Sequence, residues 1–259
     1  MRLYRVEAVE FLDRLLNRKH ASCIKGERGG SIEIYGYGNE KVLKFNGTVY
    51  SRVSKDSIYT HEYWDCFLPL ACLYPRPRVL IIGLGGGTVA YQLRKLFGAS
   101  VTIDVVETDR SMVRAMESFL PERIEVKVMI GDGAGYVKSI KHRYDTIILD
   151  AYVNDLVPEQ FLTQEFIDST YDALGPAGTF AINYINSSNG QERLEGYIAL
   201  LKARFRVFEV APNSFTSNVV LVCSKVFGKE EMLERIRAAM PRDGKNLFLL
   251  ESYEGMKEA

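Results

Sequence analysis

The chain lacks the features that several large classes of protein require. It has 33 Lys and Arg against 33 Asp and Glu, so no net charge attracts nucleic acid or a membrane surface. No apolar run approaches the length of about 18 residues that a membrane-spanning helix needs. The segment from Met1 to His20 carries too much charge for a signal peptide. We therefore expect no nucleic-acid partner and no membrane partner.

Cysteine and histidine are scarce and scattered. The four cysteines form no CxxC pair, and the three histidines show no spacing typical of metal ligands. This pattern predicts no metal site. It also predicts reduced, buried thiols and a cytoplasmic setting.

The composition is that of a globular chain, with 47% hydrophobic and 25% charged residues. Apolar side chains near helical spacing over residues 3–19 predict an amphipathic opening helix. Residues 31–53 alternate apolar and polar side chains between Gly and Asn, which predicts short antiparallel strands and tight turns. We expect residues 1–60 to form a small module of one helix and a β-sheet.

From residue 61 on, apolar runs alternate with helical patterns, beginning with a helical stretch at 61–73. The pattern predicts strands near residues 78–83, 101–106, 124–130, 144–149 and 178–183. It predicts helices near residues 88–97, 109–119, 164–174, 190–204 and 229–240. An antiparallel pair is expected at 207–210 and 218–223. Such alternation favours a parallel sheet covered on both faces, so residues 61–259 are predicted to form a Rossmann-like α/β domain.

The segment VLIIGLGGGT, from Val79 to Thr88, is the most informative part of the chain. A predicted strand enters a glycine-rich turn and a helical pattern follows at once, and Glu107 ends the next predicted strand. This arrangement is typical of sites that bind the adenosine part of a cofactor, because bare backbone approaches the ligand and the acid accepts hydrogen bonds from the ribose. The turn supplies four candidate cofactor-binding residues, Gly83, Gly85, Gly86 and Gly87.

Three acids follow three predicted parallel strands, namely Glu107, Asp132 and Asp150. Ligands of open parallel sheets bind beyond the carboxyl ends of the strands, so these acids are expected along one rim. A nicotinamide site explains Glu107 but gives no role to Asp132. An S-adenosylmethionine-type site explains all three, with ribose on Glu107, adenine on Asp132 beside Gly133 and Ala134, and the reacting end near Asp150. The alternative for Asp132 is a simple helix cap, and Asp109 is expected to be one.

The chain resembles the polyamine aminopropyltransferases, that is, spermidine synthase and its relatives, from about Ser31 to Ser224. FNGTVY, beginning at Phe45, is similar to the family's LDGxxQ, and DSIYTHE, beginning at Asp56, is similar to its DExxYHE. The resemblance implies a small N-terminal β module and a class I methyltransferase-like fold. It also implies a donor, decarboxylated S-adenosylmethionine or S-adenosylmethionine itself, and a small amine acceptor in polyamine biosynthesis.

By this resemblance Asp150 is the catalytic acid that orients the attacking amine. The family places a second aspartate three residues later, where this chain has Val153, and we expect Asp155 to replace it. Three further residues are expected to contact the acceptor. They are His61, Tyr152 and Asn183, the last in place of a family glutamine.

Other departures bear on the donor. The family's glycine loop holds an aspartate that binds the amine of the decarboxylated donor, and this chain has Gly86 there. The carboxylate of unaltered S-adenosylmethionine would favour bare backbone N–H groups at that point. The family's substrate tyrosine is Thr60 here. The loop at 211–217 matches its PTYPxGxW pattern only loosely.

Three hypotheses follow from this pattern. The first is aminopropyl transfer to a small amine, and the second is methyl transfer on the same fold, which Gly86 favours. The third is a non-catalytic nucleoside-binding relative, which Val153 favours. Edge strands in the N-terminal module and the resemblance also point to a homodimer or larger homo-oligomer.

Overall fold

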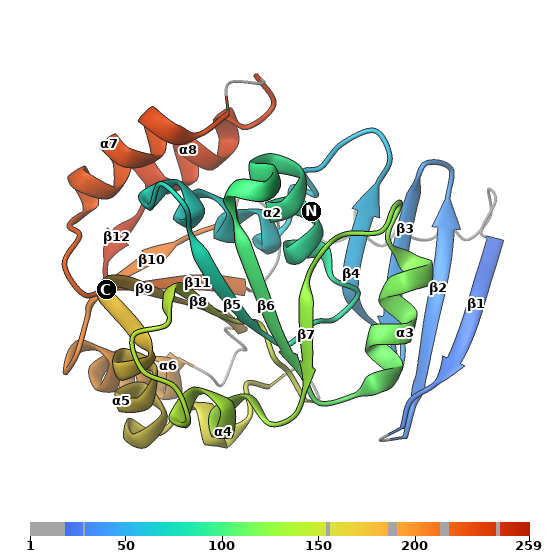
Figure 1. Cartoon of the computed structure of the whole chain (residues 1–259), viewed down its shortest axis with the longest axis horizontal. Helices are drawn as coiled ribbons and strands as arrows, with labels where there is room; N and C mark the ends of the chain where they lie inside the picture. The colour runs from blue at the N-terminus through green and yellow to red at the C-terminus, as the bar shows by residue number, and fades with distance from the viewer. Residues whose placement is uncertain (1–18, 28, 154–155, 186–190, 213–217, 242–243) are drawn as a thin grey trace. The chain divides into compact units, whose positions relative to one another are not determined.

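The computed structural model describes residues 19–259 except 28, 154–155, 186–190, 213–217 and 242–243 (Figure 1). The predicted opening helix at 3–19 lies outside the described residues. Two compact units make up the chain. The first runs up to Thr60 and also takes in Gly85–Thr88 and Asp109–Arg123, and the second holds the remaining residues. The division into domains at 1–60 and 61–259 stays a prediction.

The first unit contains an antiparallel sheet in the order β1-β2-β3-β4. Its strands are β1 (Lys19–Lys25), β2 (Ser31–Tyr37), β3 (Glu40–Phe45) and β4 (Thr48–Ser54). The structure confirms the strands expected over residues 31–53, while β1 was not predicted. Helix α3 (Arg110–Phe119) packs against β1, β2 and β3. The Asp109 side chain caps this helix by accepting the Ser111 N–H at 2.7 Å, as the sequence predicted.

The second unit is built on a mixed sheet in the order β12-β10-β11-β9-β8-β5-β6-β7 within the described part of the chain. The parallel strands are β5 (Arg78–Ile82), β6 (Thr102–Glu107), β7 (Lys127–Ile130), β8 (Tyr144–Leu149) and β9 (Leu174–Ile185). The antiparallel strands are β10 (Arg206–Val210), β11 (Asn218–Ser224) and β12 (Lys257–Glu258). The predicted α/β fold and the pairing of β10 with β11 are therefore confirmed. The short β12 was not predicted.

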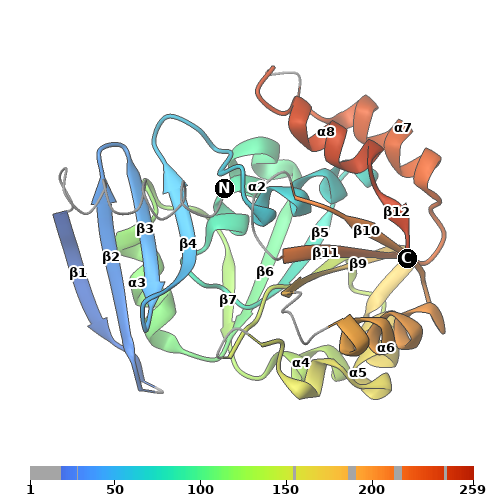
Figure 2. The same cartoon turned by 180° about the vertical axis from the view of Figure 1, so that it is seen from behind.

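Helices cover both faces of this sheet (Figures 1 and 2). One face carries α4 (Gly133–Lys138), α5 (Gln164–Ala173) and α6 (Gln191–Lys202). The other carries the 3-10 helix η1 (Tyr63–Leu73), α2 (Thr88–Phe97), α7 (Lys229–Ala239) and α8 (Leu247–Glu254). Two short 3-10 turns complete the fold, η2 (Gly98–Ser100) and η3 (Glu159–Phe161). The helices α4 and α8 are too short to show a clear period and were not predicted.

The core lies where apolar side chains of the central strands meet these helices. Leu80, Ile147 and Phe180 are fully buried. Phe166 of α5 packs edge-on against Phe180. Burying such side chains stabilises the fold by about 1.5–3 kcal/mol each before conformational entropy is subtracted. No helix of the described residues combines the length and the hydropathy that crossing a membrane requires.

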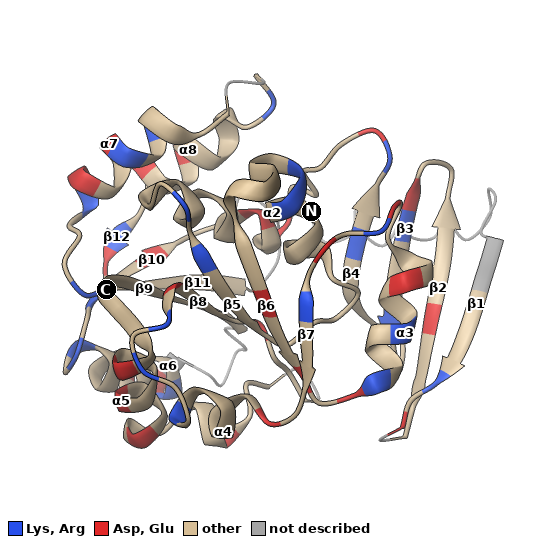
Figure 3. Ribbon diagram, in the orientation of Figure 1, with Lys and Arg blue, Asp and Glu red and all other residues tan. Residues whose placement is uncertain are grey.

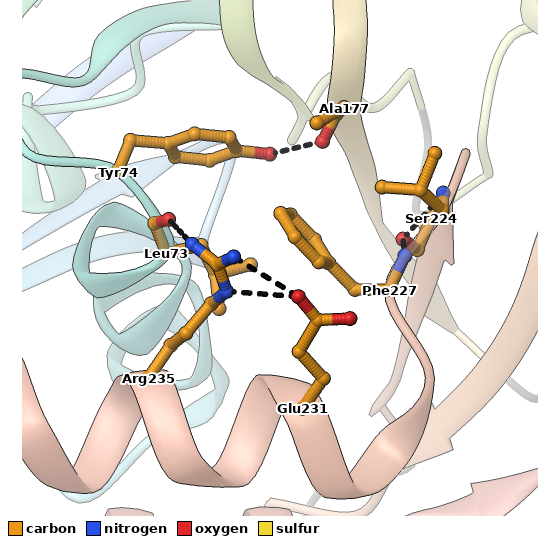
Figure 4. A network of polar contacts seen from close by, with 8 residues as sticks. Leu73, Tyr74, Ala177, Ser224, Phe227, Glu231 and Arg235 are labelled. Atoms are coloured by element: carbon orange, nitrogen blue, oxygen red, sulfur yellow. Dashed lines mark hydrogen bonds and ion pairs between the residues drawn. The ribbon is translucent and has the colours of Figure 1, made fainter.

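Helix α7, which carries both acidic and basic residues (Figure 3), is anchored to η1 by Arg235. Its guanidinium donates to the Leu73 carbonyl at 3.3 Å and to Glu231 at 3.0 Å (Figure 4). It also lies 4.7 Å from the centre of the Phe227 ring. Nearby, Tyr74 donates to the Ala177 carbonyl at 2.9 Å. These contacts join the C-terminal helices to the central layer.

We expect Arg235→Ala to lower the free energy of unfolding by about 1–2 kcal/mol, because a carbonyl loses its donor and Phe227 loses its cation. The matched control is Arg237→Ala on the same helix, whose ion pair with Glu254 is about half exposed on both sides. It should cost about 0.5 kcal/mol or less. Urea denaturation measures both, and equal losses would contradict the anchoring role of Arg235.

Candidate functional site

The three acids singled out in the sequence stand at the carboxyl ends of three parallel strands of one sheet. Glu107 ends β6, Asp132 follows β7 and Asp150 follows β8. Backbone hydrogen bonds continue the sheet past these ends. The Asp150 N–H donates to the Ile82 carbonyl, and the Gly131 N–H donates to the Glu107 carbonyl, both at 2.9 Å. The acids therefore share one rim of the sheet, where open α/β folds bind their ligands.

Glu107 is a buried carboxylate held by backbone donors. Its Oε2 accepts the Leu84 N–H at 2.9 Å, and its Oε1 accepts the Thr108 N–H at 2.6 Å. Leu84 belongs to the glycine-rich turn, so the acid fixes the start of that turn. The Thr108 hydroxyl also donates to Oε1, at 3.3 Å. A role of Glu107 in holding the ribose remains a prediction.

Asp132 caps helix α4. Its Oδ2 accepts the Gly135 N–H at 2.7 Å and its Oδ1 accepts the Gln160 amide at 2.6 Å. The capping role that the sequence left open is therefore present. Gly133 packs against the Ile82 side chain, and a Cβ added to Gly133 would lie only 2.4 Å from it. The neighbouring Ala134 is partly buried. An adenine role for these residues remains a prediction.

Asp150 is surrounded by neutral hydrogen-bond donors. The Asn183 amide donates to its Oδ1 at 2.9 Å, and the Tyr63 hydroxyl and the Trp64 indole N–H also hydrogen-bond to the carboxyl group. Burial raises the pKa of Asp150 to about 6, against the three donors, which lower it. Because that pKa lies near neutrality, the group can exchange a proton at physiological pH.

Tyr152 and Asn183, predicted to bind the acceptor, also interact with each other. The Tyr152 hydroxyl donates to the backbone carbonyl of Asn183. The side-chain oxygen of Asn183 accepts the Asn218 amide at 2.7 Å, while its nitrogen is bonded to Asp150. Asn183 thus donates directly to Asp150, while Tyr152 holds the backbone of Asn183. Contact of either residue with an acceptor remains a prediction.

His61 lies just before η1 with a left-handed backbone, φ 58°. Its backbone N–H donates to the carboxylate of the buried Asp65 at 2.7 Å. The centre of its ring lies 4.5 Å from the centre of the Phe248 ring. A non-glycine residue in this conformation is uncommon, although histidine adopts it more readily than most residues do. Contact of His61 with an acceptor remains a prediction. Asp155, the predicted second catalytic acid, lies outside the described residues.

The glycine-rich turn needs its glycines for two different reasons. Gly83 has φ 94°, and a Cβ there would lie 2.3 Å from the Asp150 carbonyl. Gly86 lies against the buried ring of Phe119, 2.6 Å from where a Cβ would stand. The Gly86 N–H donates to the Ser51 hydroxyl at 2.7 Å. Neither an acidic side chain nor an unbonded N–H is therefore present at this position. Gly85 and Gly87 both have positive φ angles.

Known proteins match this chain in sequence and in fold. Residues 68–214 match the spermine/spermidine synthase domain, which is more than half of the chain. The chain belongs to the spermine/spermidine synthase family. The resemblance found in the sequence is confirmed, and the chain is a divergent spermidine synthase-like member.

A polyamine aminopropyltransferase of Vibrio vulnificus is 30% identical over 173 residues, which cover 64% of this chain and 57% of that protein. The chain thus matches just over half the length of this curated relative. A probable spermidine synthase of Corynebacterium glutamicum has the same fold, with a TM-score of 0.69, 19% identity and coverage of 90% and 95% of the two chains. Human methyltransferase-like protein 13, solved in complex with SAH, has a TM-score of 0.56, 25% identity and coverage of 72% and 87%.

Sequence reasoning missed Tyr63, Trp64 and Asn218. Tyr63 and Trp64 lie in η1, far along the chain from Asp150, so no local pattern connects them to it. Asn218 could have been suspected only from the register of β9 and β11, which the sequence does not specify. Among the described residues, no group of three or more His, Cys, Asp or Glu side chains could hold a metal ion.

We expect the stability of the protein to depend on the ionisation of Asp150. Its pKa is raised to about 6 from an ordinary 3.8, so the folded state binds the proton more readily than the unfolded state. The stabilisation by that proton is present at low pH and is lost as the pH rises from about 4 through 6. Asp150→Asn should therefore gain stability relative to the wild type over this window, by at most about 1.4 kcal/mol per pH unit.

Urea denaturation at a series of pH values from 4 to 8 measures this difference. Asp145→Asn is the control, because it removes a carboxylate at the opposite end of β8, where Asp145 accepts the Arg78 N–H. A constant difference between Asp150→Asn and the wild type across the series would contradict the raised pKa.

We expect Gly86→Ala to destabilise the protein by about 1–3 kcal/mol, because its Cβ would overlap Phe119 and Ser51. Gly36→Ala in β2 is the matched control. A Cβ there meets nothing within 4 Å, so the change should be neutral or stabilise by up to about 1 kcal/mol. Thermal unfolding distinguishes the two, and equal tolerance would show that Phe119 does not fill the space beside Gly86.

Proposed function

We propose that this chain is a transferase that uses an S-adenosylmethionine-type donor, and that it transfers an aminopropyl group to a small amine in polyamine biosynthesis. The observation that carries the proposal is the Asp150 carboxylate. It stands on the same rim as Glu107 and Asp132, and its pKa of about 6 keeps it ionised at neutral pH. Membership of the spermine/spermidine synthase family supports the donor class.

The residues present fit the nucleoside end of such a donor. Glu107 is fixed by two backbone N–H groups at the end of β6, where an acid of an open α/β fold can accept hydrogen bonds from ribose hydroxyls. Gly83 brings bare backbone to the rim next to Asp150. When bound, the donor supplies a carbon made electrophilic by its attachment to a sulfonium sulfur.

The chain's own contribution is to place and deprotonate the acceptor. Asp150 accepts an N–H of the amine and so aims the nitrogen lone pair at the electrophilic carbon. With the donor bound, a C–N bond would form as the C–S bond breaks, and the bonding pair would remain on sulfur as a neutral thioether. The proton that the nitrogen loses passes to Asp150 and then to solvent. The ionised form of Asp150 is stabilised before the amine binds by hydrogen bonds from Tyr63, Trp64 and Asn183.

Methyl transfer on the same fold is the second candidate. Gly86 replaces the acid that would bind the amine of a decarboxylated donor, and the 25% identical human methyltransferase-like protein was solved with SAH. The Gly86 N–H is bonded to Ser51, however, so it is not available to a donor carboxylate without a rearrangement. The choice between the two donors therefore depends on residues other than Gly86.

Calorimetry with S-adenosylmethionine, its decarboxylated form and methylthioadenosine tests the donor. We expect all three to bind through the shared nucleoside, and we expect the decarboxylated form to bind most tightly. Tightest binding of S-adenosylmethionine would favour methyl transfer. Failure of all three to bind would overturn the donor class, and binding without turnover on a panel of amines would indicate a non-catalytic relative.

We expect Glu107→Gln to weaken methylthioadenosine binding by about 1–3 kcal/mol, because one acceptor for the ribose hydroxyls is lost. Glutamine is the better replacement here than alanine, since it keeps an oxygen for the buried N–H of Leu84. The control is Glu117→Gln at an exposed position on α3, which should leave the affinity unchanged. Unchanged affinity in Glu107→Gln with normal unfolding would count against its role.

A further inference from the structure

The Asn183 side chain, near the end of β9, lies between two polar partners, Asp150 after β8 and Asn218 at the start of β11. Its Nδ2 donates to Asp150 Oδ1 at 2.9 Å, and its Oδ1 accepts Asn218 Nδ2 at 2.7 Å. Asn183 is 1% exposed, so water does not replace either bond readily. The three side chains form one line of hydrogen bonds that runs from Asn218 through Asn183 to Asp150.

The strand register explains why Asn218 reaches Asn183. In the antiparallel pair of β9 and β11, Asn183 is opposite Val220. Asn218 is two residues from Val220 and therefore lies diagonally across from Asn183 on the same face of the sheet. Diagonal neighbours of this kind are within reach of each other's side chains.

Only one orientation of the Asn183 amide lets every group in this line pair a donor with an acceptor. An ionised carboxylate accepts and never donates, so Asn183 must turn its NH₂ group towards Asp150. Its oxygen then faces Asn218, which presents an NH₂ group in turn. If the Asn183 amide were reversed, its oxygen would face the carboxylate and its NH₂ group would face another NH₂ group. Asn218 therefore opposes the reversed orientation.

We propose that Asn218 is a positioning residue for Asp150. By holding the Asn183 amide with its NH₂ group towards the carboxylate, Asn218 favours the ionised form of Asp150, which is the form that accepts a proton from the acceptor amine. The proposal rests on the proposed function only in assigning Asp150 to that amine, since the hydrogen-bonded line itself is independent of the reaction.

Among the described residues, the other groups that interact with Asp150 stay uncharged while it titrates. Tyr63 of η1 and Tyr152 of the loop after β8 both have pKa values raised well above 10, mainly by burial. Trp64 of η1 and Asn183 of β9 are donors that do not titrate. A change in the pKa of Asp150 on substitution of Asn218 would therefore report on the amide line rather than on a second charge among these residues.

Trp64 supplies the measurement, because it is the only tryptophan of the chain and its indole N–H bonds to Asp150. We expect the intrinsic fluorescence of the full chain to change with pH with a midpoint of about 6. Asp150→Asn should abolish that step. The titration needs neither donor nor turnover, so its failure is distinguishable from failure of the proposed function.

Two variants of nearly equal size test Asn218. Asn218→Leu removes the donor, and we expect it to raise the midpoint by about half a pH unit or more, because Asn183 is no longer held in its donating orientation. Asn218→Asp replaces the donor by an acceptor, which attracts the Asn183 NH₂ group away from Asp150. It should raise the midpoint further than Asn218→Leu does, because the negative charge that it introduces also disfavours the ionised form of Asp150.

Asn246→Leu is the control, since Asn246 is a buried asparagine on another element and donates to the Pro241 carbonyl at the start of α8. It should leave the midpoint unchanged. Asn218→Leu decides, because it adds no charge, and Asn218→Ala takes its place if circular dichroism shows that Asn218→Leu does not fold. Where an amine is turned over, the acidic limb of the kcat profile should move with the midpoint while KM for the donor stays the same. Midpoints of the folded Asn218 variants within about 0.2 units of the wild type, or a wild-type step that survives in Asp150→Asn, overturn the proposal.

Discussion

The side chains that hydrogen-bond to the Asp150 carboxylate in the described part of the chain are neutral donors, and this arrangement constrains the chemistry of the whole rim. Burial disfavours the charge, whereas Asn183, Tyr63 and Trp64 favour it, and the balance leaves the pKa at about 6. A nearby cation would have lowered that pKa much further and made the group a poor proton acceptor. The neutral surroundings thus keep Asp150 ionised and still able to take up a proton near neutrality.

The parallel strands make this arrangement possible. Because β8, β5, β6 and β7 are neighbours with their carboxyl ends at the same rim, residues distant in sequence come together there. Gly83 allows β5 to pass the Asp150 carbonyl at a distance that no side chain would permit. The donors Tyr63 and Trp64 come from η1, which packs on the face of the same sheet. Fold and site therefore depend on the same close packing.

Much of the fold, and the acids at the rim of the sheet, could be predicted from the sequence. The strands from β5 to β9 and the helices α2, α3, α5 and α6 follow from apolar runs and helical spacing, and each lies within a few residues of its expected place. The acids at the strand ends follow from the same pattern, because a strand end is visible in a sequence when a polar residue closes an apolar run. The helices α4 and α8 and the strands β1 and β12 were missed, since short elements carry too few residues for a period to show.

What the sequence by itself determined is the class of fold, the glycine-rich turn and the positions of Glu107, Asp132 and Asp150. All of these are encoded by local patterns along the chain. Only the tertiary structure decided that Asp132 caps α4 and that the Phe119 ring fills the space beside Gly86. It also decided that hydrogen bonds link Asn218 to Asp150 through the Asn183 side chain. These outcomes depend on strand register and on contacts between residues far apart in the chain, and such contacts leave no period or spacing in the sequence from which they could be inferred.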